Sequence, residues 1–146
     1  MKKNDDSVTI SIVTVSLNSE NTIKKTIESV LNQTYKAIQY IIVDGGSTDG
    51  TVDIIRSYES KFTNSGIDFS WKSEPDNGIS DAFNKGISMS RGEYIGFINT
   101  DDWYEHDAVE TIVTNLTNKH DLYCGNIALY DINNNYIKIK KSRPAL

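Results

Sequence analysis

Apolar residues follow two different spacings along most of the chain, and the two spacings alternate. Continuous or alternating apolar runs predict strands over residues 8–15, 38–43, 67–71 and 94–98. Apolar positions three or four residues apart predict helices over residues 23–31, 51–58, 79–87 and 108–116. Strands that alternate with helices in this way are typical of a parallel sheet with helices on both faces.

The pattern changes beyond residue 121. Two alternating runs, residues 122–130 and 136–140, lie on either side of an Asn-Asn-Asn turn and together predict an antiparallel hairpin. We therefore expect an α/β fold with a mainly parallel, doubly wound sheet and an antiparallel extension near the C-terminus. A length of 146 residues suits one domain. Because the closing residues offer nothing to cover the sheet edge, we expect a further segment or a partner chain to cover it.

The charge of the chain narrows its range of partners. Aspartate and glutamate outnumber lysine and arginine by 20 to 15, which gives a formal net charge of −5. This balance argues against nucleic-acid binding and against adsorption to anionic lipid. No apolar run approaches the roughly 20 residues that span a bilayer, and the first residues lead into a predicted strand, so we do not expect them to be a signal peptide. With Cys124 as the single cysteine, we expect a cytoplasmic protein without an internal disulfide.

Polar residues gather directly after the four predicted parallel strands, where open α/β sheets bind their ligands. The carboxylates among them repel one another, and a hard divalent cation commonly offsets such repulsion. Mg²⁺ or Mn²⁺ binds through one or two carboxylates together with the phosphates of a substrate. The residues concerned are Ser16, Leu17, Asn18 and Glu20 after the first strand, Asp44, Gly45, Gly46 and Asp49 after the second, Glu74, Asp76 and Asn77 after the third, and Asn99, Asp101 and Asp102 after the fourth.

Several of these residues also have a purely structural interpretation. Residues 44–46 form a tight turn as readily as a site, and we favour the turn for this segment taken alone. Asp49 is a suitable N-cap for the helix that follows it. Two adjacent acids, Asp101 and Asp102, exceed what one helix cap requires, so here we favour a functional role.

Motifs of several common enzyme classes are absent from the sequence. The chain has no G-x-G-x-x-G after the first predicted strand and no G-x-x-x-x-G-K-[ST] phosphate loop. It also lacks a G-x-S-x-G segment, and one cysteine with two isolated histidines does not suit a zinc site. These absences argue against dinucleotide-dependent oxidoreductases, P-loop kinases and hydrolases.

Five segments occur in the order and spacing of a known family. They are residues 11–18 (SIVTVSLN), 29–35 (SVLNQTY), 42–51 (IVDGGSTDGT), 74–86 (EPDNGISDAFNKG) and 92–102 (GEYIGFINTDD). Over about residues 8–116 the chain resembles the inverting family 2 glycosyltransferases with the GT-A fold, which include enzymes that build bacterial surface polysaccharides.

The resemblance implies a sugar transferase that uses a nucleotide-diphosphate sugar, foremost a UDP-sugar, and a glycan or lipid-linked acceptor. It implies Mn²⁺ or Mg²⁺ on Asp101 and Asp102, which stand at the D-x-D position; the cation would neutralise charge on the departing diphosphate. A peripheral position at the inner face of the membrane and a homo-oligomer are both compatible with it. The nucleotide-sugar site implied by the resemblance comprises Ser16, Leu17, Asn18, Glu20, Asp44, Gly45, Asp76, Asn77, Gly78, Asn84, Lys85, Thr100 and Asp101.

Departures from the family pattern limit what the resemblance implies. Asn99 stands where many relatives have the first aspartate of D-x-D, which leaves the cation to Asp101 or Asp102. Phe83 stands where an arginine is frequent, and Lys85 is the candidate to take over its contact. The general base of the family is an acid well beyond the D-x-D segment, so we expect residues 1–146 to form a single GT-A domain that is the donor-binding half, without that base.

Two other functions remain open on the sequence alone. A nucleotide-sugar-binding module without turnover has the same donor site and differs only in lacking sugar transfer or donor hydrolysis. A sugar-nucleotide nucleotidyltransferase shares the general layout, but no Gly-rich, basic triphosphate loop follows the first predicted strand.

Overall fold

The structure is a computed structural model of the chain, and it describes residues 7–116, 122–131 and 133–141. The chain divides into two compact units, residues 1–113 and 114–146, and each has its own sheet. Among the described residues, no helix is long and apolar enough to cross a membrane.

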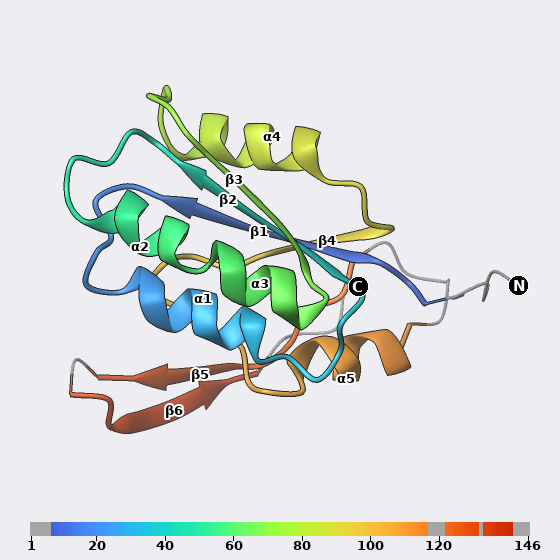
Figure 1. Cartoon of the computed structure of the whole chain (residues 1–146). Coiled ribbons are helices and arrows are strands. Elements are labelled where there is room, and N and C mark those ends of the chain that lie inside the picture. The colour runs from blue at the N-terminus through green and yellow to red at the C-terminus, as the bar shows by residue number, and fades with distance from the viewer. Residues whose placement is uncertain (1–6, 117–121, 132, 142–146) are drawn as a thin grey trace, which may run out of the picture. The chain divides into compact units, whose positions relative to one another are not determined.

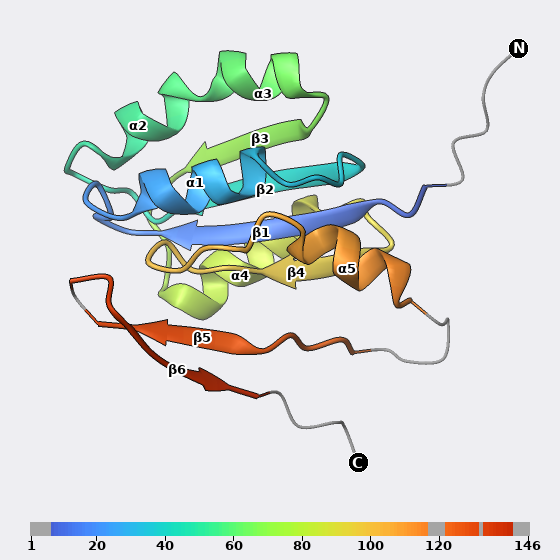
Figure 2. The same cartoon turned by 90° about the horizontal axis from the view of Figure 1, so that it is seen from below.

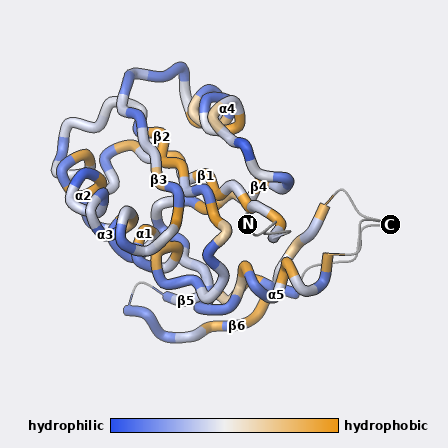
Figure 3. The backbone as a smooth tube through the Cα atoms, turned by 45° about the vertical axis from the view of Figure 1, so that its right-hand side comes forward, coloured by the Kyte–Doolittle hydropathy of each residue, from blue (hydrophilic) through white to orange (hydrophobic). Residues whose placement is uncertain are grey.

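The first unit is built on a four-stranded parallel sheet with the strand order β3-β2-β1-β4 (Figure 1). Every residue of β1 and β2 is buried, as their continuous apolar runs predict. Apolar residues are accordingly concentrated in these two central strands (Figure 3). The strands are β1 (Ile10–Ser16), β2 (Ile38–Asp44), β3 (Asp68–Ser73) and β4 (Tyr94–Phe97).

Helices cover both faces of this sheet, and alternate side chains of the central strands reach the two helical layers. Ile12 and Tyr40 pack in the cluster with α1, α2, α3 and α5, whereas Val13 and Ile41 pack with α4 on the opposite face. The doubly wound α/β arrangement expected from the sequence is thereby confirmed. The helices are α1 (Ile23–Leu31), α2 (Thr51–Ser57), α3 (Glu59–Ser65), α4 (Ile79–Met89) and α5 (Ala108–Thr114).

The order of the strands reverses at β1. From β1 the chain builds outward through β2 to β3, and α4 then returns it to β4 on the other side of β1 (Figure 2). The loops after β1 and β4 lead to α1 and α5 on one face of the sheet, whereas the loop after β3 leads to α4 on the other face. Such a switch point opens a crevice at the carboxyl ends of the strands.

The sequence pattern did not reveal α3. The expected helix over residues 51–58 ends at Ser57, and α3 follows directly after Tyr58. Phe62 is the one buried residue of α3, and its ring stacks on Phe69 of β3 with the centroids 4.3 Å apart. A single aromatic anchor in a polar segment produces no apolar stripe, so tertiary packing rather than periodicity accounts for this helix.

The second unit holds the antiparallel hairpin that the sequence predicts. Strands β5 (Ile127–Tyr130) and β6 (Tyr136–Lys140) form a sheet of their own, and β5 begins five residues later than expected. The Asp131 carboxylate closes the turn by accepting hydrogen bonds from the backbone N–H groups of Asn133 and Asn135, both at 2.8 Å.

Candidate functional site

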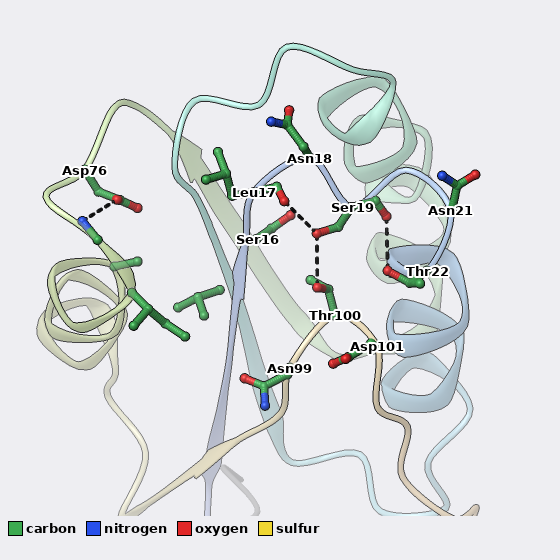
Figure 4. Close-up of a pocket in the computed structure, with 14 residues that line it drawn as sticks. Ser16, Leu17, Asn18, Ser19, Asn21, Thr22, Asp76, Asn99, Thr100 and Asp101 are labelled. Carbon is green, nitrogen blue, oxygen red and sulfur yellow. Dashed lines mark hydrogen bonds between the residues drawn. The ribbon is translucent and has the colours of Figure 1, made fainter. Parts of the chain in front are cut away.

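A cleft of about 680 Å³ opens at the carboxyl end of β1, where the strand order reverses (Figure 4). Its floor is the end of β1 and the turn that follows, one wall is the loop after β4, and the other wall is the β3–α4 loop with the first turn of α4. Its lining residues are Val15, Ser16, Leu17, Asn18, Ser19, Asn21, Thr22, Asp76, Gly78, Ile79, Ala82, Asn99, Thr100 and Asp101.

The structure brings part of the expected site to this cleft and places the rest elsewhere. The expected residues that line it are Ser16, Leu17, Asn18, Asp76, Gly78, Thr100 and Asp101. Those that do not line it are Glu20, Asp44, Gly45, Asn77, Asn84, Lys85 and Asp102. The sequence signal of the lining residues that the expected site omitted is their place at the end of β1, in the turns after β1 and β4, and in the first turn of α4. These residues are Val15, Ser19, Asn21, Thr22, Ile79, Ala82 and Asn99.

The floor of the cleft carries a polar atom without a partner. Ser16 is 5% exposed, and among the described residues its Oγ is the buried side-chain oxygen or nitrogen that makes no hydrogen bond. Because buried hydroxyls are normally paired, an unpaired one that lines a cleft points to a ligand atom that completes it.

Asn18 holds an unusual backbone conformation at the rim. Its φ of 48° lies in the left-handed region, which asparagine tolerates better than most residues. The loop after β2 supports it: its backbone N–H donates to Ser47 Oγ at 2.8 Å, and its Oδ1 accepts from the backbone N–H of Thr48 at 2.9 Å. The turn after β1 is therefore set by contacts with the neighbouring loop.

Glu20 also links the loop after β1 to the loop after β2. Its carboxylate accepts a hydrogen bond from the Gly50 backbone N–H at 2.7 Å, and its own backbone N–H donates to Asp49 at 3.2 Å. A hydrogen bond from the Thr51 hydroxyl lowers the pKa of Asp49. The acids at 20 and 49 thus tie the two loops together. The N-cap of α2 is Gly50, without a side-chain cap, so the capping role considered for Asp49 is wrong; Asp49 instead accepts hydrogen bonds from Thr51.

Asp44 is fully buried and organises the turn after β2. Its Oδ2 accepts hydrogen bonds from the backbone N–H groups of Gly46 and Ser47, at 3.1 and 2.9 Å, and from Ser73 Oγ at 2.7 Å. With these partners its carboxylate faces the protein rather than the cleft. The structural interpretation of residues 44–46 as a tight turn fits this geometry, and Asp44 is a positioning residue here.

The wall after β4 is fastened to α1. Thr26 Oγ1 donates to the carbonyl oxygen of Asp102 at 2.7 Å, and the fully buried Gln33 donates through Nε2 to the carbonyl oxygen of Glu105 at 2.7 Å. These contacts leave Asp101 on the side of the loop that lines the cleft (Figure 4).

Asp101 and Asp102 interact electrostatically. Burial and the adjacent charge of Asp101 raise the pKa of Asp102, and a hydrogen bond with Asn99 opposes the rise. Within the described parts of the chain no three His, Cys, Asp or Glu side chains group so as to hold a metal. A magnesium or manganese ion that arrives with substrate phosphates needs only one or two carboxylates, so Asp101, which lines the cleft, fits such a cation.

The opposite wall is held by Lys85. Its Nζ lies 3.2 Å from Glu74 Oε1 and 3.1 Å from Asp81 Oδ2, and it donates to the carbonyl oxygen of Pro75 at 3.3 Å. The hydrogen bonds to Asp81 and Glu74 raise the pKa of Lys85. Lys85 therefore fastens the β3–α4 loop to α4 instead of reaching into the cleft.

Curated relatives are bacterial glycosyltransferases. Glycosyltransferase GlyA of Streptococcus pneumoniae is 34% identical over 84% of this chain, and putative glycosyltransferase EpsH of Bacillus subtilis is 36% identical over 82%. The putative teichuronic acid biosynthesis glycosyltransferase TuaG of Bacillus subtilis is 35% identical over 69%. The aligned part spans 17% of GlyA, 33% of EpsH and 39% of TuaG, well under half of each relative.

Solved structures share the fold. Staphylococcus aureus TarS 1–349 in complex with UDP-GlcNAc has a TM-score of 0.66 and 21% identity, and the match covers 73% of this chain and 30% of that one. The mannosyltransferase PcManGT from Pyrobaculum calidifontis, in complex with GDP-Man and Mn²⁺, has a TM-score of 0.61 and 20% identity over 66% of this chain and 28% of that one.

The family itself follows from the sequence match. The profile described as glycosyl transferase family 2 matches residues 11–144, nearly the whole chain, and the GT-A-like fold agrees with it. The chain belongs to glycosyl transferase family 2.

Proposed function

We propose that the chain is the donor-binding part of an inverting, metal-dependent glycosyltransferase. In this proposal a sugar moves from a nucleotide-diphosphate sugar, with a UDP-sugar as the first candidate, to a glycan or lipid-linked acceptor. The observation that carries the proposal is the cleft at the switch point of the sheet, with the Asp101 carboxylate on one wall and the unpaired Ser16 hydroxyl on the floor.

The relatives support the substrate class. TarS binds UDP-GlcNAc, PcManGT binds GDP-Man with Mn²⁺, and TuaG is described as a teichuronic acid biosynthesis enzyme. The first two descriptions agree with a nucleotide-sugar donor, and that of TuaG agrees with a role in bacterial polysaccharide synthesis.

In the proposed mechanism the described residues bind and orient the donor. Asp101, with Asp102 beside it, would hold a divalent cation, which would neutralise the charge that develops on the departing diphosphate. Ser16 and the turn around Asn18 would position the nucleotide at the end of β1. The acceptor hydroxyl must lose a proton as it attacks the anomeric carbon, and we assign that base to no residue of this chain.

Calorimetric titration tests the proposal. UDP and GDP are added with and without Mn²⁺ to the native chain and to the Asp101→Ala and Asp102→Ala variants, and Asp53→Ala on α2 is the control. We expect Mn²⁺-dependent binding that Asp101→Ala weakens by at least tenfold and that the control retains. Absence of binding to a folded native chain, judged by circular dichroism, would contradict the donor-site proposal.

Turnover separates the transferase from a binding module. A donor that binds and is slowly hydrolysed, or whose sugar is transferred to an added acceptor, supports catalysis, and the readout is release of UDP from a UDP-sugar. Tight donor binding with no release above the rate of the Asp101→Ala variant favours the non-catalytic alternative.

A further inference from the structure

Helix α1 turns a buried hydroxyl toward the loop after β4. Thr26 is fully buried on this helix, and its Oγ1 donates to the carbonyl oxygen of Asp102 at 2.7 Å and lies 3.4 Å from that of Asn99. A threonine hydroxyl inside a helix usually bonds a carbonyl group of the preceding helical turn. The hydroxyl of Thr26 instead crosses to another segment of the chain.

The two carbonyl groups that Thr26 contacts belong to one turn. The backbone N–H of Asp102 donates to the carbonyl oxygen of Asn99 at 3.2 Å and so closes residues 99–102. A single hydroxyl of α1 thus holds both ends of this turn. Asp101 lies within the turn, on the wall of the cleft (Figure 4).

The loop is anchored again directly beyond this turn. Ser29, one helical turn after Thr26, accepts through its Oγ the backbone N–H of Tyr104 at 3.1 Å. Gln33, two residues beyond the end of α1, accepts through its Oε1 the backbone N–H of Val109 at 3.0 Å. Positions spaced in this way lie on one side of a helix, so α1 presents a row of polar partners to the backbone of the loop.

The Asp101 carboxylate has no such anchor of its own. Within residues 7–116, 122–131 and 133–141, no hydrogen bond or ion pair is formed to this carboxylate. Its direction therefore depends on the backbone of the turn, which Thr26 holds. Valine would fill the space of Thr26 with nearly the same shape, so packing alone does not account for a hydroxyl at this position.

We propose that Thr26 and Ser29 are positioning residues for the divalent cation that Asp101 would hold, because their hydrogen bonds to the loop keep this carboxylate facing the cleft. The inference rests on the proposed function, since the cation belongs to that donor site. Neither Thr26 nor Ser29 lines the cleft, so both act through the backbone of the loop. Outer partners that orient metal ligands typically change the metal affinity by about 10–100-fold.

The effect of Mn²⁺ on nucleotide affinity tests this role. Calorimetry gives the dissociation constant of UDP without and with Mn²⁺, and the ratio of the two constants measures the coupling between cation and nucleotide. Thr26→Val keeps the shape of the side chain and removes its hydroxyl. We expect it to lower the ratio by about tenfold and to leave the affinity for UDP alone within about twofold of native.

Two further variants separate positioning from stability. Ser29→Ala releases the N–H of Tyr104, which lies farther from Asp101, and should lower the ratio by about threefold. Thr26→Ser keeps the hydroxyl and loses a buried methyl group, so it should unfold at a lower temperature than the native chain and still keep the native ratio.

Thr63→Val is the matched control. It makes the same replacement on α3, where the exposed hydroxyl of Thr63 donates to the carbonyl oxygen of Glu59 in its own helix at 2.9 Å. We expect this variant to keep the native ratio. Thermal unfolding of every variant shows that the ratio is measured on folded protein.

The outcomes distinguish this inference from the proposed function. A native ratio in Thr26→Val, or in Ser29→Ala if Thr26→Val does not fold, would overturn the positioning role while the donor site stands. A ratio that falls with the unfolding temperature across the series, Thr26→Ser included, would overturn it as well. A folded native chain that binds neither UDP nor GDP, or binds them equally with and without Mn²⁺, would overturn the metal-dependent donor site and this inference together.

Discussion

A buried hydroxyl without a partner lowers stability by about 1–3 kcal/mol, and Ser16 carries one at the floor of the cleft. Ser11, on the same strand, is the opposite case. It is fully buried, but its Oγ donates to Gln39 Oε1 at 2.7 Å and accepts from the Gly92 backbone N–H at 2.8 Å. The two serines therefore differ in whether the protein itself satisfies the buried hydroxyl.

Replacement of Ser16 by alanine should stabilise the fold and lower the affinity for the nucleotide. We expect Ser16→Ala to raise the free energy of unfolding by about 1 kcal/mol, because the unpaired group is removed, and to weaken nucleotide binding roughly fivefold. Urea unfolding and calorimetry measure the two effects. The control Ser11→Ala should instead lower stability by about 1–3 kcal/mol, since it leaves the buried Gly92 N–H without its acceptor, although Gln39 Oε1 keeps the Arg91 N–H. A destabilised Ser16→Ala variant with native affinity would contradict this role.

The sequence predicts residue positions better than side-chain directions. Ser16, Asp76 and Asp101 follow strands, and their place at the cleft could be anticipated from that alone. Asp44 follows a strand too, yet its carboxylate turns inward to the backbone N–H groups of its own loop. Spacing along a chain does not encode such local hydrogen bonds, so this difference needed coordinates.

At the scale of elements, α4 packs closely against β1 of the sheet. A Cβ atom on Gly86 would lie 2.3 Å from Val13 Cγ1, a fully buried atom of β1. The glycine thus lets the helix approach the strand, and this approach sets the height of the wall that carries Gly78 and Ile79.

Gly86→Ala should destabilise the first unit in spite of the higher helix propensity of alanine. We expect a loss of about 1–3 kcal/mol from overpacking, against less than about 1 kcal/mol gained in propensity. The measurement is urea unfolding, with the exposed Ser88→Ala on the same helix as a control that stays within about 0.5 kcal/mol of native. Val13→Ala should relieve the clash, so additive effects in the double variant would contradict the assignment.

Elements with a regular spacing of apolar residues could be predicted from the sequence, and a short helix without such a spacing could not. The bounds expected for α1 agree with the structure, and those for β2 differ by one residue, because apolar spacing determines both. Helix α3 depends on Phe62, which packs against Phe69 of β3 and against Tyr40 of β2, and these contacts leave no apolar periodicity in the helix itself. The start of β5 was placed too early because apolar residues from 122 onward resemble a strand without pairing as one.

At the scale of the molecule, the cleft lies wholly within the first compact unit. All its lining residues fall between positions 15 and 101, and that unit ends at residue 113. A nucleotide that binds there should stabilise the unit by about 2.7 kcal/mol at one hundred times its dissociation constant.

Hydrogen exchange on the full chain checks where this stabilisation acts. Saturating UDP with Mn²⁺ should slow amide exchange in β1, β2 and β4, whereas the amides of the β5–β6 hairpin should exchange at their unliganded rate. Equal protection of the hairpin would show that the second unit is energetically coupled to the donor site, contrary to this prediction.

The strand order also has a consequence for synthesis on the ribosome. β1 pairs with β4 in parallel, and Ile10 lies opposite Tyr94 in the register. The second edge of β1 therefore finds its hydrogen-bonding partner only when residues around 97 have left the ribosome. About 50 residues separate the end of β2 from the end of β4, which corresponds to about 3–10 s of translation at 5–20 residues per second. For that interval the nascent chain presents an apolar strand with an open row of backbone donors and acceptors, the state in which a chaperone is most needed. The crossover that opens the cleft in the finished protein is thus also the step that delays its completion.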